Sequence, residues 1–242
     1  RVQTRTNDSG TEMVRVIENK DGKLSVILSQ EEVYYRDNLL GVEASEEESD
    51  VLLMEPLVKG TQWTLSDDRK RSITETGVEI NTPLGDYQAL EVTTEGPDSI
   101  IKDYYAPEVG LVKTIFSSEG IEITSSLSEI NEDVALRKNV EFYYPDQDGE
   151  IYLREKELSF NTNDITRITL QNQLREEPPE ESYLPLISQR TRINYIYLGN
   201  DNIAYIDFSK DFINDMNAGA YYESMILQSL INTIGTYYGV ER

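Results

Sequence analysis

The sequence contains neither cysteine nor histidine. Their absence excludes Ser-His-Asp and Cys-His nucleophile systems, together with zinc sites built from imidazole or thiolate ligands. No disulfide stabilises the fold, so bridges give no indication of the redox compartment. An active site would have to use carboxylate, Lys, Tyr, Ser or Thr side chains, or a hard metal ion with oxygen ligands.

Basic residues are also scarce, with 22 Lys and Arg against 45 Asp and Glu and a net charge of −23. The densest basic run is residues 69–71, and it lies directly beside Asp67 and Asp68. Binding to nucleic acid, or to an anionic membrane surface through side chains, requires a basic patch. The sequence therefore predicts neither partner, and solubility accounts for the acidity.

Long apolar runs are absent as well, since none reaches the ~18–20 residues that a membrane-spanning helix needs. There is no signal peptide, but the sequence begins at Arg1 and not at Met, so this absence indicates little about export. A length of 242 residues with 38% hydrophobic content is typical of one large or two small globular domains.

Residues 1–131 are predicted to form an all-β domain. The apolar runs 13–17 and 24–28 flank Asn-Lys-Asp-Gly at 19–22, which predicts a hairpin. Further short strands are predicted at 32–36, 50–54, 62–65, 71–76, 77–81, 88–94, 100–106, 110–116 and 121–127. Their spacing of roughly ten residues favours an antiparallel meander, either a curved sheet or a partly open barrel. Trp63, the one tryptophan, is predicted to anchor the core.

A polar stretch at 128–139 has no clear period and indicates a linker, placed at 132–138. A second domain at 139–242 is then predicted, with strands at 139–144, 151–159, 192–198 and 202–208 and helices at 164–175 and 218–238. Thr162 or Asn163 is the predicted N-cap of the first helix. This mixed order predicts an α+β fold, with both helices on one sheet face.

Two motifs in the second half carry a family resemblance. The first is VEFYYPDQDGEIYL at 140–153, and the second combines Asp-Phe-Ser at 207–209, Phe212, Gly219 and Ser-Leu-Ile-Asn-Thr at 229–233. In this order and spacing they resemble the GerMN domain of spore-forming and related bacteria. The resemblance implies a role in sporulation or germination. In the family a further strand usually follows the last helix, and whether one follows residue 242 stays open.

The first half carries a second resemblance. The phrases EPLVKGTQW at 55–63, TPLG at 82–85 and YYAPEVGLVK at 104–113 are similar to a theme in bacterial lipoproteins of unassigned function. The resemblance implies an extracytoplasmic protein held at the membrane by an N-terminal lipid anchor. The cysteine of such an anchor is not in this sequence, and the resemblance implies no reaction.

Two pairs of carboxylates are candidate sites. Asp146 and Asp148 precede Gly149 in a fragment of a calcium-loop pattern, but the glycine comes too early for an EF-hand, and the alternative is an Asp-Gly hairpin turn. Asp207 and Asp211 flank the entry to the last helix. They could act as the acid pair of a glycan hydrolase, or they could shape the turn while Phe208 and Phe212 pack into the core.

Tyrosine is the residue type most suited to a ligand surface, and ten of the sixteen lie in doublets at 34–35, 104–105, 143–144, 221–222 and 237–238. On a strand a doublet places one ring on each face, so several rings should face solvent and could stack on sugars or fill an interface. The polar face of the last helix is either a docking stripe or simply solvated; it carries Glu223, Ser224, Gln228 and Asn232.

The sequence predicts no catalytic, cofactor-binding or metal-ligating residue. The leading interpretation is a non-enzymatic envelope module that binds or scaffolds a protein partner through a sheet edge or helix face. The alternatives are a peptidoglycan-binding module that uses exposed tyrosines and, third, a carboxylate-dependent glycan hydrolase. Nucleic acid is not an expected partner, and contact with the membrane is expected only through the lipid anchor.

Overall fold

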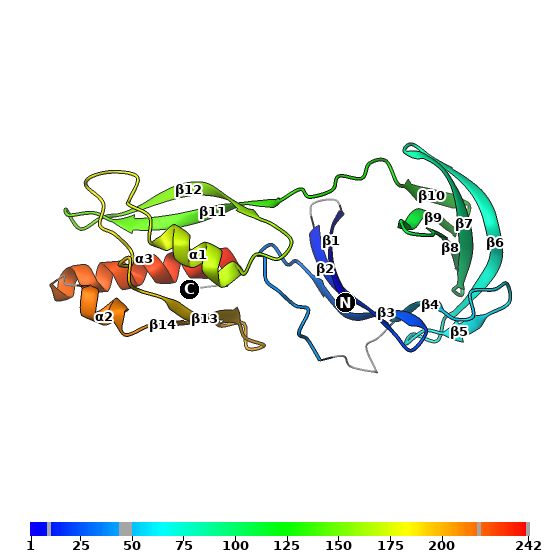
Figure 1. The fold of residues 1–242 in the computed structure, drawn as a ribbon, viewed down its shortest axis with the longest axis horizontal. Coiled ribbons are helices and arrows are strands. Elements are labelled where there is room, and N and C mark those ends of the chain that lie inside the picture. Colours follow the sequence, from blue (N-terminus) through cyan, green and yellow to red (C-terminus); the bar gives the residue numbers. More distant parts are fainter. Residues whose placement is uncertain (9–10, 44–49, 217–218, 241–242) are drawn as a thin grey trace. The chain divides into compact units, whose positions relative to one another are not determined.

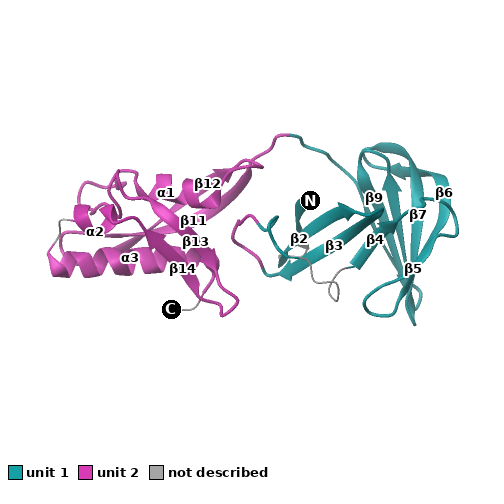
Figure 2. Cartoon of the chain, turned by 60° about the horizontal axis from the view of Figure 1, so that its bottom comes forward, with its two compact units in different colours: residues 1–32, 39–132 teal, residues 33–38, 133–242 magenta. Residues whose placement is uncertain are grey.

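The computed structural model describes residues 1–8, 11–43, 50–216 and 219–240. The chain divides into two compact units (Figure 2). Unit 1 comprises residues 1–32 and 39–132, and unit 2 comprises residues 33–38 and 133–242.

The first sheet of unit 1 is a four-stranded antiparallel meander. Its strands, in spatial order, are β1 (Val2–Asp8), β2 (Thr11–Lys20), β3 (Lys23–Glu31) and β4 (Asp50–Met54). The hairpin predicted around 19–22 is confirmed. Asp21 and Gly22 adopt φ angles of 51° and 72°, which two-residue hairpin turns require.

The second sheet of unit 1 has six antiparallel strands. They are β5 (Gln62–Thr64), β6 (Lys70–Thr82), β7 (Gly85–Glu95), β8 (Ser99–Ala106), β9 (Gly110–Ser118) and β10 (Ile121–Ser126), each paired with its neighbour in sequence. The predicted strands 71–76 and 77–81 are one strand, β6. Register shifts at Thr74 and at Gly77, which has a φ of 69°, bend this strand without ending it (Figure 1). The curved, open meander confirms the predicted architecture.

Polar groups join and brace the two sheets of unit 1. The Trp63 indole donates a hydrogen bond of 2.8 Å to the carbonyl of Val51, which ties β5 to β4. Arg71 on β6 forms a buried ion pair of 3.1 Å with Asp103 on β8 and donates to Thr94 on β7 between them. Trp63 therefore links the sheets at a partly buried position, and the charged pair crosses three strands inside one sheet.

Unit 2 combines two antiparallel hairpins with helices. The hairpins are β11 (Leu136–Pro145) with β12 (Ile151–Phe160), and β13 (Ile193–Leu198) with β14 (Ala204–Phe208). The helices are α1 (Thr166–Leu174), α2 (Asp211–Asp215) and α3 (Ala220–Tyr238). Helix α3 packs against β11 and contacts β14, whereas α1 contacts β12 and β13 (Figure 1). The α+β class and the packing of C-terminal helices on sheet are confirmed.

Three local details of unit 2 differ from the predictions. Strand β11 begins at Leu136, inside the predicted linker, and the short helix α2 was not predicted. The N-cap of α1 is Ile165 and not Thr162 or Asn163, and it makes no side-chain capping bond. Ala218, within the predicted second helix, lies outside the described residues.

The core of unit 2 forms where α3 covers the strands. Its apolar face buries Ile226, Leu230 and Ile234, as the three- and four-residue spacing predicts. The helix ends at Gly239, which adopts the left-handed φ of 68° that favours glycine, and the next amide donates back to the Gly235 carbonyl. Among the described residues, no helix combines the length and apolar character needed to cross a membrane.

A short segment from the N-terminal half, residues 33–38, belongs to unit 2 and is called the strap below. The prediction of a strand at 32–36 is wrong, because these residues form no strand and Arg36 bonds instead to side chains of unit 2. The Arg36 carbonyl accepts hydrogen bonds from the hydroxyls of Thr166 (3.0 Å) and Tyr237 (2.7 Å). The Tyr35 ring lies 4.9 Å from the ring of Tyr238.

Candidate functional site

An apolar groove runs between β14 and α3 and has a volume of about 370 Å³. It is called the edge groove below. Strand β14 contributes Ala204, Ile206 and Phe208, and these side chains also pack against the core of unit 2. Helix α3 contributes Leu227, Leu230, Ile231, Ile234 and Gly235. The groove therefore has apolar walls from two elements that the core already holds in place.

One side of the groove is an edge strand. Among the described residues, β14 pairs only with β13. The Ile203 carbonyl accepts from Gly199, and the Ser209 amide donates to Arg192, so the odd-numbered residues bond toward β13. Because backbone polar groups alternate along an antiparallel strand, those of Ala204, Ile206 and Phe208 point away from β13. The same three residues thus offer apolar side chains to the groove and backbone groups to its open side.

The outward surface of α3 is less polar than the sequence predicted. Leu227 and Ile231 are 45% and 56% exposed, although both are aliphatic. By contrast, Asn232 is buried and accepts a hydrogen bond of 2.8 Å from Gln228. The predicted polar stripe is therefore interrupted by apolar residues, because the helix turns Asn232 inward and exposes the groove residues instead.

A cluster of exposed tyrosines, the tyrosine ladder, covers the other face of the β13–β14 hairpin. The rings of Tyr195 and Tyr197 lie 5.9 Å apart, and the ring of Tyr197 stacks at 5.2 Å on that of Tyr205. All three side chains are exposed. Tyr205 also donates a hydrogen bond of 2.7 Å to Asp201, so its hydroxyl is fixed in position.

The tyrosine doublets did not identify this cluster. Tyr237 and Tyr238 are both buried, and Tyr104 and Tyr144 are buried as well. The useful signal was Tyr-Ile-Tyr at 195–197, because alternate residues of a strand share one face. The third ring comes from the partner strand, and only the pairing register places it beside Tyr197.

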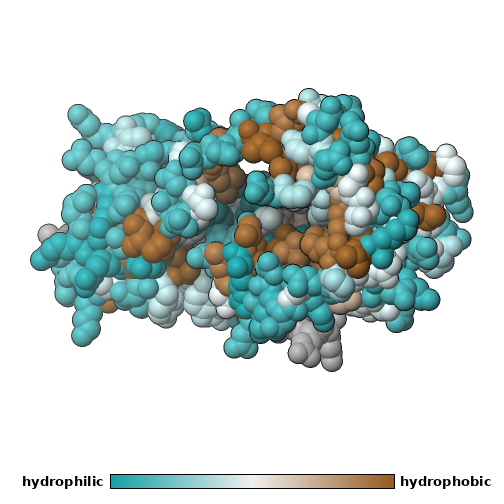
Figure 3. Space-filling model, turned by 45° about the vertical axis from the view of Figure 1, so that its right-hand side comes forward, coloured by the Kyte–Doolittle hydropathy of each residue, from teal (hydrophilic) through white to brown (hydrophobic). Residues whose placement is uncertain are grey.

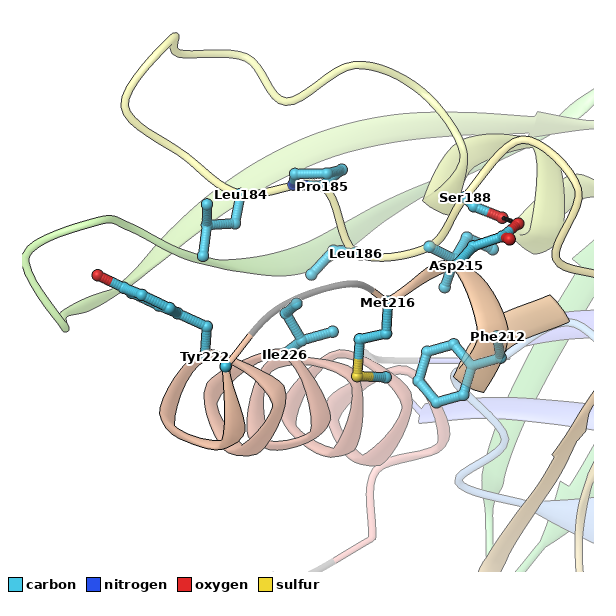
Figure 4. Close-up of a pocket in the computed structure, with 11 residues that line it drawn as sticks. Leu184, Pro185, Leu186, Ser188, Phe212, Asp215, Met216, Tyr222 and Ile226 are labelled. Carbon is cyan, nitrogen blue, oxygen red and sulfur yellow. Dashed lines mark hydrogen bonds between the residues drawn. The ribbon is translucent and has the colours of Figure 1, made fainter. Parts of the chain in front are cut away.

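A second pocket, of about 440 Å³, lies between the 184–188 segment and the start of α3 (Figure 4). Asp215 lies at one end and Tyr222 at the other. The Asp215 carboxylate accepts a hydrogen bond of 2.7 Å from Ser188 and forms an ion pair with Arg190. The contact with Arg190 has the largest effect, and together with the Ser188 hydrogen bond it lowers the pKa of Asp215. The carboxylate is therefore held ionised and is not suited to act as a general acid.

The two carboxylates considered for glycan hydrolysis make local hydrogen bonds. Asp207 accepts a bond of 2.7 Å from the Asn194 side chain on the neighbouring strand. Asp211, in the first turn of α2, accepts one of 3.1 Å from the Ser209 hydroxyl. Phe208 and Phe212 stack at 4.6 Å between them and line the edge groove. The geometry is that of a shaped turn between β14 and α2.

Asp146 organises the turn between β11 and β12. One of its carboxylate oxygens accepts hydrogen bonds from the backbone amides of Asp148 (3.0 Å) and Glu150 (2.8 Å). Gly149 has a φ of 96°, as a tight turn requires. Within the described part of the chain, no group of three or more acidic side chains is arranged to hold a metal ion. The structure thus gives Asp146 the role of stabilising a hairpin turn.

Unit 1 holds one further polar cluster that the sequence did not indicate. Glu91 accepts hydrogen bonds from Thr74 (2.7 Å) and Tyr104 (2.8 Å) and pairs with Lys102. Burial, together with the bond to Glu91, raises the pKa of Tyr104 to about 12. Burial opposes ionisation of Glu91, but its hydrogen bonds and Lys102 outweigh this and lower its pKa. Neither group is therefore poised to transfer a proton near neutral pH.

The exposed apolar side chains are not restricted to the groove. The face drawn in Figure 3 is largely hydrophilic, with apolar side chains gathered in separate patches. On β10 of unit 1, Ile121 and Ile123 are exposed on one face of an edge strand. The edge groove differs from such a patch because it combines exposed aliphatic side chains with a recess and outward-pointing backbone groups.

Comparison with known proteins relates the second half of the chain to a protein family. No curated protein and no solved structure matches the sequence. A family model, Germane, matches residues 141–242, and its description is sporulation and spore germination. This range contains β12, β13 and β14, and with them the tyrosine ladder and the edge groove. Residues 141–242 are therefore similar to the Germane domain, a family linked to sporulation and germination.

Proposed function

We propose that this protein is a non-enzymatic assembly module that binds a protein partner during sporulation or germination. The observation that carries the proposal is the edge groove. Edge strands of monomeric proteins are usually blunted by Lys, Pro, bulges or covering segments. Within the described residues, β14 pairs only with β13, and Ala204, Ile206 and Phe208 line the groove with Leu227 and Ile231 exposed alongside. Exposed apolar surface of this kind marks interaction sites.

The carboxylates support a binding role over a catalytic one. Asp207, Asp211 and Asp215 each accept a hydrogen bond from a neighbouring side chain that fixes a turn or loop. The match to the Germane model names a process and no reaction. A binding module in that process requires surface complementarity and no reactive group.

The proposal includes a location outside the cytoplasm, with the chain held at the membrane by an N-terminal lipid anchor. What supports it is the resemblance of residues 55–63, 82–85 and 104–113 to bacterial envelope lipoproteins. Protease accessibility in intact cells, compared with lysed cells, tests the location. Full protection from added protease until lysis would contradict it.

The assembly proposal is tested by photo-crosslinking in the cells that make this protein. A benzophenone amino acid replaces Ile231 in the groove, and a control chain carries it at Ile123, which is exposed on unit 1. We expect a discrete protein adduct from position 231 and none of the same mass from position 123. The absence of any adduct at 231 throughout sporulation and germination would overturn the proposal.

A second function, binding to the glycan of peptidoglycan, is favoured by the tyrosine ladder. Exposed tyrosine rings at this spacing offer flat apolar faces on which sugar rings stack. The test is cosedimentation of the purified chain with insoluble peptidoglycan at low and high salt. Retention that disappears in a Tyr195→Ser/Tyr197→Ser variant, but not in Tyr34→Ser, would support it. Failure of the unaltered chain to pellet would remove it.

A further inference from the structure

We infer that the pocket between the 184–188 segment and the start of α3 binds a small organic amine, whose ammonium group bonds to Asp215 while its apolar body fills the rest of the pocket. The inference goes beyond the proposed assembly function and does not rest on it. The pocket lies at the first turns of α3 (Figure 4), at the other end of this helix from Tyr238, and shares only Phe212 with the edge groove. It is called the Asp215 pocket below.

The size and walls of the Asp215 pocket determine the body of the ligand. Its volume of about 440 Å³ falls in the range of small-molecule sites. A cavity of about 150 Å³ holds one benzene ring, so the pocket has room for a ligand of roughly 12–18 heavy atoms. Only three of the 11 lining residues carry a polar side-chain atom, namely Ser188, Asp215 and Tyr222. The ligand must therefore be largely aliphatic or aromatic.

The three polar side chains offer an acceptor to a ligand and no donor. The Ser188 hydroxyl donates to Asp215 (2.7 Å), and the Tyr222 hydroxyl donates to the Gln147 carbonyl (3.0 Å). An ionised carboxylate has about four acceptor positions, and Ser188 and the two donors of Arg190 occupy three of them. The remaining position on Asp215 suits a ligand that donates a hydrogen bond. A carboxylate or phosphate ligand would find no side-chain donor in the pocket.

The charges around Asp215 favour a cationic donor over a neutral one. The Asp215 side chain is only 10% exposed, so its attraction for a cation is screened less than at the surface. Its partner Arg190 is not part of the lining and is 73% exposed. Asp215 and, to a lesser extent, Asp211 raise the pKa of Arg190, so two carboxylates face this cation. Glu223, in the first turn of α3, offsets the positive end of the helix. An ammonium group complements the net negative charge that results.

The probes are ω-phenylpentylamine and the alcohol and carboxylate of the same chain length, each titrated into the purified chain to about 10 mM. About twelve heavy atoms support a dissociation constant in the millimolar range or below. The readout is the methyl NMR signal of Met216, which lines the pocket, because the chain has only four methionines. Met13 and Met54, on β2 and β4 of unit 1, are internal controls. We expect a saturable shift of the Met216 signal, with the amine binding about tenfold more tightly than the alcohol or the carboxylate.

Matched variants of the protein test the role of Asp215. Asp215→Asn keeps the size of the side chain and should weaken amine binding by about tenfold or more, with the alcohol affected by less than about twofold. Glu181→Gln removes the same charge at an exposed position outside the pocket and should change neither. Arg190→Gln removes the competing cation and should strengthen amine binding by about twofold to fivefold. Leu184→Trp narrows the pocket and should weaken the amine and the alcohol alike.

The opposite signs expected for the two ion-pair variants separate recognition from a structural role. If Asp215 and Arg190 served only to hold the 184–188 segment in place, both variants would weaken binding, and that result would overturn the inference. Absence of a saturable Met216 shift with the amine would overturn it as well, as would affinities for the three probes that agree within about twofold. Far-UV circular dichroism shows whether each variant keeps α3. If Asp215→Asn loses the helix, the comparison of the three probes on the unaltered chain still decides.

Discussion

Replacement of Arg36 by alanine should destabilise unit 2 and leave unit 1 unchanged. The Arg36 guanidinium donates to the Asp164 carbonyl and to the Thr166 hydroxyl, the latter at 2.8 Å, and lies 5.4 Å from the centre of the Phe160 ring. Two further contacts, to Asn161 and Thr162, are 3.4 Å long and contribute little.

The expected magnitude follows from these contacts. A charged donor contributes about 1.5 kcal/mol for each of the two shorter hydrogen bonds, and the ring contact adds about 0.5 kcal/mol. The free energy of unfolding of unit 2 should therefore fall by about 3.5 kcal/mol. With a urea dependence of about 2 kcal/mol per molar, the midpoint should shift down by about 1.8 M.

The chain supplies a separate signal for each unit. Trp63, the one tryptophan, lies in unit 1, whereas the helices of the described residues, α1, α2 and α3, all lie in unit 2. Urea titrations followed by helical circular dichroism should show the shift for Arg36→Ala, and tryptophan fluorescence should not. Arg36→Lys keeps the positive charge but loses the planar set of guanidinium donors. Its urea midpoint by circular dichroism should lie between those of the unaltered chain and Arg36→Ala. A shift in Trp63 fluorescence equal to that in circular dichroism would refute the assignment of the strap to unit 2.

Three further predictions concern single positions. Arg71→Met leaves Asp103 charged and buried without its partner, so the unfolding midpoint followed by tryptophan fluorescence should fall by the equivalent of about 3–5 kcal/mol, and Arg71→Met/Asp103→Leu should recover most of it. Gly239→Ala forces a β-carbon into a left-handed backbone and should cost about 1 kcal/mol by circular dichroism; no change would mean that the C-cap is dispensable. The pKa of Glu91 is lower in the folded state than in the unfolded chain. Its contribution to the stability of unit 1 is therefore present above the unfolded-state pKa and is lost as the pH falls through the folded-state pKa. Glu91→Gln should flatten the pH dependence of unit 1 stability in that acidic range. An unaltered profile would contradict the conclusion that ionised Glu91 stabilises unit 1.

Much of the local structure is predictable from the amino-acid sequence. Asp21-Gly22 specified a hairpin because few other residues adopt positive φ angles, and the spacing of Ile226, Leu230 and Ile234 specified an amphipathic helix. These features depend on neighbours within a few positions along the chain. The motifs at 140–153 and 207–233 likewise indicated the GerMN domain, and a family model matches the same region.

The candidate sites, by contrast, depend on contacts between residues that are far apart in the sequence. The strap joins unit 2 because Arg36 bonds to groups more than a hundred positions later, which no local pattern encodes. The tyrosine ladder needs the cross-strand register that sets Tyr205 beside Tyr197. The edge groove arises because β14 pairs on one side only, within the described residues, while α3 turns Leu227 and Ile231 outward next to it. Periodicity shows which face of an element is apolar, but packing decides which apolar residues stay uncovered.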